Sequence, residues 1–304
     1  AKAHRHIVTK AQSGRILLHF VPMCLCYFVP YLNIGNFIMS AELLETCLSG
    51  LINGSTYALI AIGMALVYGI TKTFNFAYGS FFVLSGYLAW LLFSFGLPYP
   101  AVFLIVVPVV FGVGAAVERF IIRRLRTRKE WEISVVITTL GLALFMDNLH
   151  LALFGPFVKS LPPLLDDNIT IAGIVTSRHD AATVVISLGI IIAFWIFLSR
   201  TKTGMAMRAV AQDMTGADIV GIPKDRIFWF AFGISCAFVA IEGILFAPRY
   251  FVVYSGGWEI MMKGWVMTVF GGMGSLTGAV LAGFILGMVE ALVGWQIGFT
   301  WTMS

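Results

Sequence analysis

The sequence predicts an all-α, polytopic integral membrane protein with about eight or nine transmembrane helices, some of them broken or re-entrant. Apolar residues make up 59 % of the 304 residues and charged residues only 12 %. The mean hydropathy is +0.92, and long uncharged stretches separate the few charged clusters. A water-soluble core could not hide this much apolar surface, so soluble enzymes and nucleic-acid-binding domains are excluded.

Uncharged stretches mark the transmembrane helices, because roughly 20 apolar residues are needed to cross a hydrocarbon layer roughly 30 Å thick. The uncharged run between Glu45 and Lys72 is long enough for one crossing, and the run between Lys72 and Glu118 is long enough for two. We expect spans at residues 16–38, 43–70, 74–97, 99–122, 131–154, 181–199, 227–247 and 276–297, with a further short apolar stretch at 258–270.

The first span is interrupted by Pro22 and Pro30 and contains His19. A basic segment followed by an apolar run also occurs in secretory signals, but no Ala-x-Ala cleavage site follows within reach. Residues 16–38 are therefore a true crossing or a retained signal anchor. Both alternatives give the same orientation.

Basic residues orient the helices. Sixteen of the 20 Lys and Arg residues lie before residue 16, at Lys72, between residues 119 and 129, and between residues 200 and 226. Alternating crossings place these segments on one side, which the positive-inside rule makes cytoplasmic. The N-terminus is then expected inside, and Ser304 outside.

The sequence lacks the patterns of catalytic, metal and nucleotide sites. The four cysteines, Cys24, Cys26, Cys47 and Cys236, have neither zinc spacing nor His partners. There is no Gly-Lys pair for a phosphate-binding loop and no Gly-x-Ser-x-Gly elbow. We expect no catalytic residue, metal site or cofactor in this chain, so a transporter would draw energy from a gradient or from a separate subunit.

Polar side chains inside the expected spans are candidates for a translocation path. Asn53, Ser55 and Tyr57 lie in the second span, where lipid would penalise them, so they face either protein or a wet path. Helix packing alone is the alternative, and the Gly50-x-x-x-Gly54 spacing permits close approach of another helix.

Two apolar segments are interrupted by glycines near the two ends of the chain. Residues 74–80, Phe-Asn-Phe-Ala-Tyr-Gly-Ser, include Asn75, Tyr78 and Ser80, and residues 270–278, Phe-Gly-Gly-Met-Gly-Ser-Leu-Thr-Gly, include Ser275. Paired broken helices of this kind indicate the translocation site of a transporter.

The segment 200–226 differs from a plain connector. Met205 to Asp213 is a good helix former, and Gly216, Gly221 and Pro223 divide the remainder of the segment into short pieces. Short helices with charged side chains beside exposed Met and Val suit docking into a groove on a partner. A solvated linker is the alternative.

Taken in order, these stretches resemble the LivH-type permease of branched-chain amino acid ABC importers. The matching motifs are Gly-Ser-Thr-Tyr-Ala-Leu-Ile-Ala-Ile-Gly, Val-Tyr-Gly-Ile, Asn-Phe-Ala-Tyr-Gly, Gly-Met-Ala-Met-Arg-Ala-Val-Ala-Gln-Asp with Val-Gly-Ile, and Gly-Gly-Met-Gly-Ser-Leu-Thr-Gly-Ala, spread over residues 43–295. The resemblance implies the ABC importer permease fold for residues 43–304, after a cytoplasmic N-terminus and an extra span in residues 1–42.

The resemblance also implies partners and a location. They are a LivM-like permease, two cytoplasmic ATPases that use ATP and Mg, and a substrate-binding protein, assembled at a bacterial cytoplasmic (inner) membrane with a small-molecule substrate and no nucleic acid. By the same likeness, the loop from Gly204 to Gly221, with Arg208, Asp213 and Asp218, couples this permease to an ATPase.

Some features depart from the family pattern. The span at 16–38 is extra, the usual final inward helix is expected to be missing from the chain, and Tyr78 stands where the family has His. Glu242 places a carboxylate where the family is apolar, and Asp147 is a second intramembrane carboxylate. Each costs roughly 2.5 to 3.5 kcal/mol unless it is paired or wet, so both are path candidates unless they lie solvated near a membrane face.

The expected mechanism is alternating access driven by ATP, with tight substrate selection left to the binding protein and only weak polar contacts along the path. A gradient-driven or facilitative carrier for urea, an amide or another small polar solute is the rival, and a membrane enzyme lacks any catalytic cluster. The substrate itself stays open among branched-chain and other amino acids, urea, amides and aromatic acids. Tryptophans such as Trp258 fit interfacial anchors and substrate contacts equally well.

Overall fold

The computed structural model describes residues 41–297 except 128, 166 and 172–173. The chain divides into two compact units, residues 1–45 and 46–304. The first unit is described only from residue 41 onward, so the expected span at 16–38 and the basic N-terminus lie outside the described residues. Ser304, at the end of the second unit, also lies outside them.

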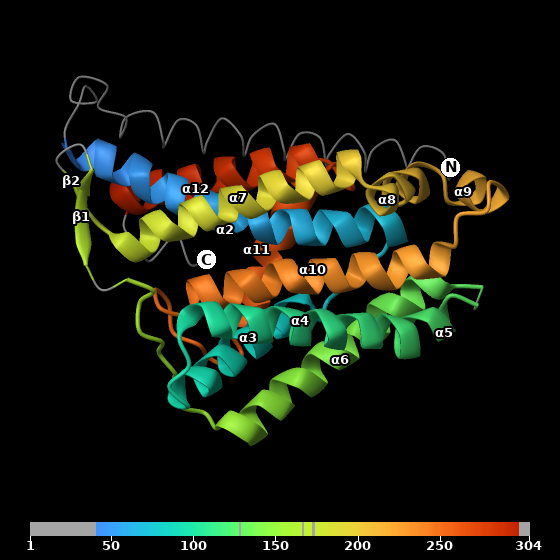
Figure 1. The fold of residues 1–304 in the computed structure, drawn as a ribbon, viewed down its shortest axis with the longest axis horizontal. Coiled ribbons are helices and arrows are strands. Elements are labelled where there is room, and N and C mark those ends of the chain that lie inside the picture. The colour runs from blue at the N-terminus through green and yellow to red at the C-terminus, as the bar shows by residue number, and fades with distance from the viewer. Residues whose placement is uncertain (1–40, 128, 166, 172–173, 298–304) are drawn as a thin grey trace, which may run out of the picture. The chain divides into compact units, whose positions relative to one another are not determined.

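The described part of the chain is predominantly helical, which confirms the all-α, multi-pass prediction (Figure 1). Its elements are α2 (Ala41–Thr71), α3 (Tyr78–Ser94), α4 (Tyr99–Val117), the π-helical turn η2 (Glu118–Ile122), α5 (Arg123–Leu125), α6 (Trp131–Phe154), β1 (Asn168–Ile171), β2 (Ile174–Ser177), α7 (Arg178–Arg200), α8 (Lys202–Gln212), α9 (Met214–Ile219), α10 (Lys224–Phe246), α11 (Gly257–Phe270) and α12 (Leu276–Ile297).

Within the described residues, six helices are long and apolar enough to cross a membrane by length and composition: α2, the continuous α4–η2–α5 helix, α6, α7, α10 and α12. The shorter α3 and α11 have 17 and 14 residues. Together these eight helices agree with the spans expected in the described residues. The helix of the expected span at 74–97, α3, begins at Tyr78 rather than at residue 74.

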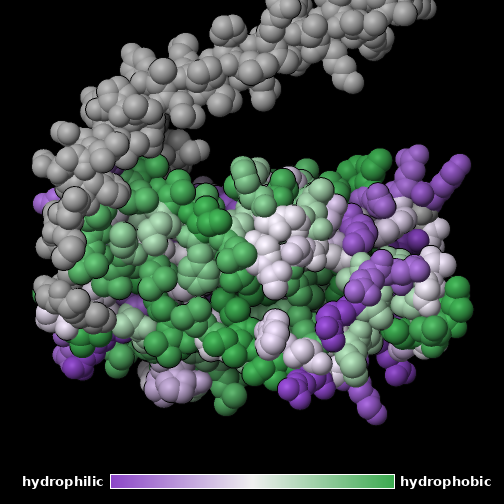
Figure 2. Space-filling model, turned by 90° about the horizontal axis from the view of Figure 1, so that it is seen from above, coloured by the Kyte–Doolittle hydropathy of each residue, from purple (hydrophilic) through white to green (hydrophobic). Residues whose placement is uncertain are grey.

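α2 and α10 form the centre of the second unit. In their most apolar 18-residue stretches, 89 % of α2 and 72 % of α10 is buried, against 22 % in both α7 and α12. α10 packs mainly on α4 and α3. The outer helices expose large apolar side chains, including Leu104, Phe145, Trp195 and Leu281. Figure 2 shows such a hydrophobic surface, with hydrophilic residues gathered at one end.

Glycines bring α2 and α12 into direct backbone contact. A Cβ added at Gly283 would lie 2.6 Å from Ala58 Cα, and one added at Gly287 would lie 2.5 Å from Gly54 Cα. On the α2 side, a Cβ at Gly54 would lie 3.0 Å from Phe284 Cα. The Gly50-x-x-x-Gly54 spacing therefore has a partner, which is the equivalent Gly283-x-x-x-Gly287 spacing on α12.

Two ends of the bundle can be distinguished. At the basic end, Lys72 Nζ donates to the carbonyl of Ala211 on α8 over 3.2 Å, and Gly69 packs against Gly274 in the break between α11 and α12. At the hairpin end, β1 and β2 pair antiparallel with Asn168 opposite Ser177. The sequence did not predict this small hairpin, which lies in a polar segment joining α6 to α7.

We expect Gly283→Ala to destabilise the protein, because the new Cβ would meet the α2 backbone and force the helices apart, at a cost of roughly 1–3 kcal/mol. Gly112→Ala on α4 is the matched control, since nothing lies within 4 Å of an added Cβ there. It should be neutral or stabilise by roughly 0.5–1 kcal/mol through helix propensity. Thermal unfolding of the detergent-purified variants measures both. Equal melting temperatures would contradict the close crossing.

Candidate functional site

α3 begins inside the bundle instead of at its end. Tyr78, its first residue, donates its hydroxyl to the Ile60 carbonyl over 3.0 Å. Ile60 lies eleven residues before the end of α2 at Thr71, which is roughly 16 Å along a helix. The backbone N–H of Phe76 likewise donates to Thr139 on α6 over 3.2 Å. Residues 72–77 therefore return into the bundle as non-helical chain enclosed by protein, as membrane depth requires.

The N-terminus of α11 meets that of α3. A Cβ added at Gly257, the first residue of α11, would lie 2.5 Å from the Gly79 carbonyl oxygen, so only glycine permits this approach. α11 then runs toward the basic end, where Gly274 packs on Gly69. Two short helices thus direct the partial positive charge of their N-termini at one interior point.

Asp147 of α6 occupies that point. Ser80 Oγ donates to Asp147 Oδ1 over 3.0 Å, and Trp258 Nε1 donates to Asp147 Oδ2 over 2.7 Å. Ser80 lies in the first turn of α3 and Trp258 in the first turn of α11, so both donors come with the helix ends. The carboxylate is 8 % exposed. Two charge-assisted hydrogen bonds and two helix dipoles explain how it is accommodated there.

Two other residues of the first broken segment, Asn75 and Tyr78, are also buried. Asn75 accepts a hydrogen bond at Oδ1 from the Ala77 N–H over 3.0 Å, and its buried Nδ2 has no partner among the described residues. Tyr78 is fully buried. The segment is therefore pinned by its own side chains.

The remaining predicted path residues are spread along the bundle. Ser55 is buried, with its hydroxyl bonded to the Ile52 carbonyl over 2.8 Å, and Asn53 is half-buried on the same helix. Ser275 is exposed and caps α12 by accepting the Gly278 N–H over 3.2 Å. Glu242 on α10 is fully buried, and neither carboxyl oxygen has a partner among the described residues.

A charged cluster that the sequence did not predict surrounds Tyr57. Lys263 Nζ lies 3.0 Å from the Tyr57 hydroxyl, 2.9 Å from Glu290 Oε1 and 3.0 Å from Glu259 Oε1. It joins α2, α11 and α12. Lys263 and Glu259 form an i,i+4 pair that the sequence does contain, but Glu290 is 27 residues further along the chain, so its part is visible only in the fold.

The expected coupling segment forms two short helices, α8 and α9, at the basic end. Met207, Val210 and Ala217 are buried, whereas Arg208 and Asp218 are exposed. A Cβ added at Gly204 would lie 2.5 Å from Leu198 Cα, so glycine lets α8 fold back on α7. Asp213 caps α9 by accepting the Thr215 N–H over 2.9 Å, and Gly221 ends it with a φ of +83°.

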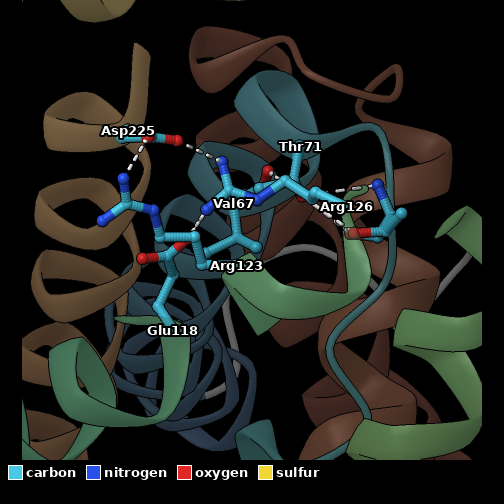
Figure 3. A network of polar contacts seen from close by, with 7 residues as sticks. Val67, Thr71, Glu118, Arg123, Arg126 and Asp225 are labelled. Atoms are coloured by element: carbon cyan, nitrogen blue, oxygen red, sulfur yellow. Dashed lines mark hydrogen bonds and ion pairs between the residues drawn. The ribbon is translucent and has the colours of Figure 1, made fainter. Parts of the chain in front are cut away.

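Ion pairs connect this region to the neighbouring helices. Asp218 of α9 pairs with Lys224 of α10 over 2.8 Å, and the adjacent Asp225 pairs with Arg123 over 2.6 Å (Figure 3).

Arg126 also lies near Asp225 and pairs with the buried Glu118 in the π-helical turn (Figure 3). Burial lowers the pKa of the Arg126 guanidinium, while the Asp225 carboxylate raises it. A continuous series of charges therefore runs from α9 through the start of α10 to the end of α4.

The described residues hold no group of three or more His, Cys, Asp or Glu side chains able to bind a metal ion. Several of the polar positions form three groups: the Asp147 point, the charged cluster at Tyr57, and the surface of α8 and α9.

Comparison with known proteins places these groups in one matched region. The family described as "Branched-chain amino acid transport system / permease component" matches residues 46–304. The branched-chain amino acid transport permease BraD of Pseudomonas aeruginosa is 32 % identical over 263 residues, covering 82 % of this chain and 85 % of BraD. LivH of Escherichia coli is 30 % identical over 272 residues with the same coverage. A probable LivH of Methanocaldococcus jannaschii is 27 % identical over 256 residues, 80 % of this chain and 78 % of that protein.

We expect Asp147→Ala to lower the melting temperature and to abolish solute movement, because it removes the charge that compensates two helix N-termini and leaves two buried donors without their acceptor, at roughly 1–3 kcal/mol per donor. Asn148→Ala on the same helix is the matched control, since Asn148 is exposed and donates to the Leu144 carbonyl within its own helix. The double variant Asp147→Ala/Trp258→Phe should cost less than the sum of the single variants. Strict additivity would show that the two residues act independently.

Proposed function

This chain belongs to the permease components of branched-chain amino acid transport systems, and we propose that it imports branched-chain amino acids as one half of an ATP-driven translocation path, beside a LivM-like permease. The match over residues 46–304 carries the proposal, because it includes both broken segments and the α8–α9 surface. Family membership favours an ABC importer over a gradient-driven carrier or channel.

The basic end faces the cytoplasm in this proposal, because Lys72 and the described basic residues between 119 and 129 and between 200 and 226 lie on that side. The protein then sits in the bacterial inner membrane with a cytoplasmic N-terminus. Residues 1–42 precede the permease domain at residues 43–304. The hairpin end faces outward and receives the substrate-binding protein.

An ATPase subunit docks on α8 and α9. Their buried residues fix the two helices to α7 and α10, which leaves an outer surface for the partner. That surface combines charge with large apolar side chains, namely Met205, Arg208, Ile219 and Val220. Two such ATPases bind and hydrolyse ATP with Mg, and this permease supplies no catalytic group.

Movement of the docked ATPase reaches the path through three contacts. Lys72 binds the last turn of α8 to the end of α2, and Asp218 binds α9 to Lys224 of α10. Asp225, the next residue of α10, forms the third contact by pairing with Arg126. α2 and α10 are the two most buried helices, so a displacement of α8 and α9 acts on the centre of the permease.

The path follows the polar side chains in and beside the central helices. In order along the chain they are Asn53, Ser55, Tyr57, Asn75, Tyr78, Ser80, Asp147, Glu242 and Ser275. Most of these groups already bond within the protein, so a solute passing them meets only weak, exchangeable contacts. This suits rapid release after the binding protein has selected the substrate.

Reconstituted uptake tests the proposal. Vesicles containing the co-purified complex, with ATP and Mg inside and the binding protein and labelled leucine outside, should accumulate leucine. Excess isoleucine or valine should compete, and excess urea should not. Uptake that needs no ATP, or a chain that purifies without ATPase subunits, would refute the importer and favour a carrier or channel.

Reversing the charge at the coupling surface should uncouple transport from hydrolysis. Arg208 is exposed and has no polar partner among the described residues, so Arg208→Glu should leave the melting temperature unchanged. It should cut ATP-driven uptake about tenfold, which corresponds to about 1.4 kcal/mol of coupling. Arg208→Lys is the matched control.

Asp213 separates folding from docking at the same surface. Asp213→Asn keeps an oxygen acceptor for the Thr215 N–H, whereas Asp213→Ala loses the helix cap. If the carboxylate contacts the ATPase, both variants lose uptake. If only Asp213→Ala does so, the role of Asp213 is to cap α9, and it drops out of the coupling set.

A further inference from the structure

We propose that the exposed stripe of α11, formed by Glu259, Met262, Val266, Val269 and Phe270, is the surface on which the second permease subunit packs within the membrane. The inference rests on the proposed function for the existence of that subunit. The structure contributes the location of the contact on this chain.

The stripe follows helix periodicity. Its residues recur at spacings of three and four and are exposed, whereas the opposite face of α11 buries Ile260, Met261, Gly264 and Met267. A Cβ added at Gly264 would lie 3.1 Å from both Ile60 and Met64, so the buried face is the one against α2. The stripe points away from this chain's own core.

The charged cluster at the start of the stripe lies in the outer half of the hydrocarbon layer. Lys263 bonds to Tyr57, which is fourteen residues before the end of α2 at Thr71, roughly 21 Å along the helix. The hydrocarbon layer is roughly 30 Å thick. The side chains of Glu259, Lys263 and Glu290 are 48 %, 20 % and 16 % exposed. An ionisable side chain exposed to acyl chains inside the hydrocarbon layer costs free energy unless it is paired, which favours a protein occupant over lipid.

The cluster also carries unbalanced charge. One ammonium group serves two carboxylates, and Glu290 Oε2 is buried without a partner among the described residues. The occupant therefore supplies a cation or hydrogen-bond donor near Glu259. The rest of the stripe, from Met262 to Phe270, is apolar except for the flanking Lys263. An apolar surface of this kind does not favour a water-filled channel as the occupant. A protein helix offers an apolar face and a donor together.

The exposed face of α7 provides the contrast. Its central turns expose Val185, Ile192, Trp195 and Ile196. No acidic or basic residue lies between Asp180 and Arg200. This is the composition of a lipid-facing helix, so α7 serves as the internal control.

Photo-crosslinking in the assembled transporter tests the proposal. A benzophenone amino acid replaces Met262 in one sample and Trp195 in the other, two side chains that are 50 % and 63 % exposed. The probe at position 262 should crosslink to the second permease, and the probe at position 195 should give only lipid adducts. Mass spectrometry of the adducts identifies the partner.

The outcomes separate this inference from the proposed function. Three results at position 262 would overturn the proposed contact surface and leave the proposed function intact. They are lipid adducts, a crosslink to residues 16–38 of the same chain, and no adduct in a complex that contains a second permease. A crosslink between two copies of this chain would uphold the surface and overturn the LivM-like partner. Absence of any second permease would overturn both.

A substitution at Glu259 adds a second measurement, because a lipid-facing surface and a permease contact predict opposite effects of it. Glu259→Leu would improve a lipid-facing surface, but it removes the acceptor that a permease partner needs. We expect at least a threefold loss of co-purified second permease, whereas Glu132→Leu on α6, an exposed acidic residue at the basic end, should cause none. Unchanged or increased recovery with Glu259→Leu would count against the proposal.

Discussion

One carboxylate, that of Asp147, accepts two hydrogen bonds and so holds the centre of this permease together. α3 and α11 each begin inside the bundle, and a helix that begins there leaves its first N–H groups without water and its partial positive charge unscreened. Asp147 compensates the partial charge of both helix ends and accepts one side-chain hydrogen bond from each, from Ser80 Oγ and Trp258 Nε1. The N–H groups of Ala77 and Tyr78 at the start of α3 are accepted by Asn75 instead. The charge of Asp147 is tolerated only because those two helix ends are present. The carboxylate and the helix ends thus depend on each other.

The same requirement explains the arrangement around that point. Non-helical chain at membrane depth must be enclosed by protein, and residues 72–77 are enclosed by α2 and α6 through Tyr78 and Phe76. The close approach of Gly79 and Gly257 removes the side chains that would otherwise separate the two ends. α10 then covers α3 from the other side. Glu242 is the exception, because it is buried in α10 without any partner among the described residues.

The sequence predicted the local features of the fold. Hydropathy located the long helices, glycine spacing located both breaks, and the helix-forming run from Met205 to Asp213 located α8. These signals depend on neighbours within a few residues. The hairpin of β1 and β2 is also local, but it is too short to stand out within a polar connection.

The pairings could not be predicted, because they join distant residues. Ser80 and Asp147 are 67 residues apart, Asp147 and Trp258 are 111 apart, and Tyr57 and Lys263 are 206 apart. Asp147 was recognised as a costly carboxylate, yet only the fold shows that its partners are helix ends rather than cations. The sequence shows that Ser55 and Ser275 are polar, but it does not show that each hydroxyl forms a hydrogen bond with a nearby backbone group. Their roles in transport stay predictions.

The glycine contact between α2 and α12 also affects how the two helices can move. Interdigitated side chains resist sliding, because each must leave its socket before the next position is reached. Here the side chains of Phe284 and Met288 on α12 lie against Gly54 and Gly50 of α2, so the glycines form the sockets and sliding along the axis would force these side chains out of them. The bonds of Lys263 to Tyr57 and Glu290 fix the same register, so α2 and α12 are expected to move together as one body.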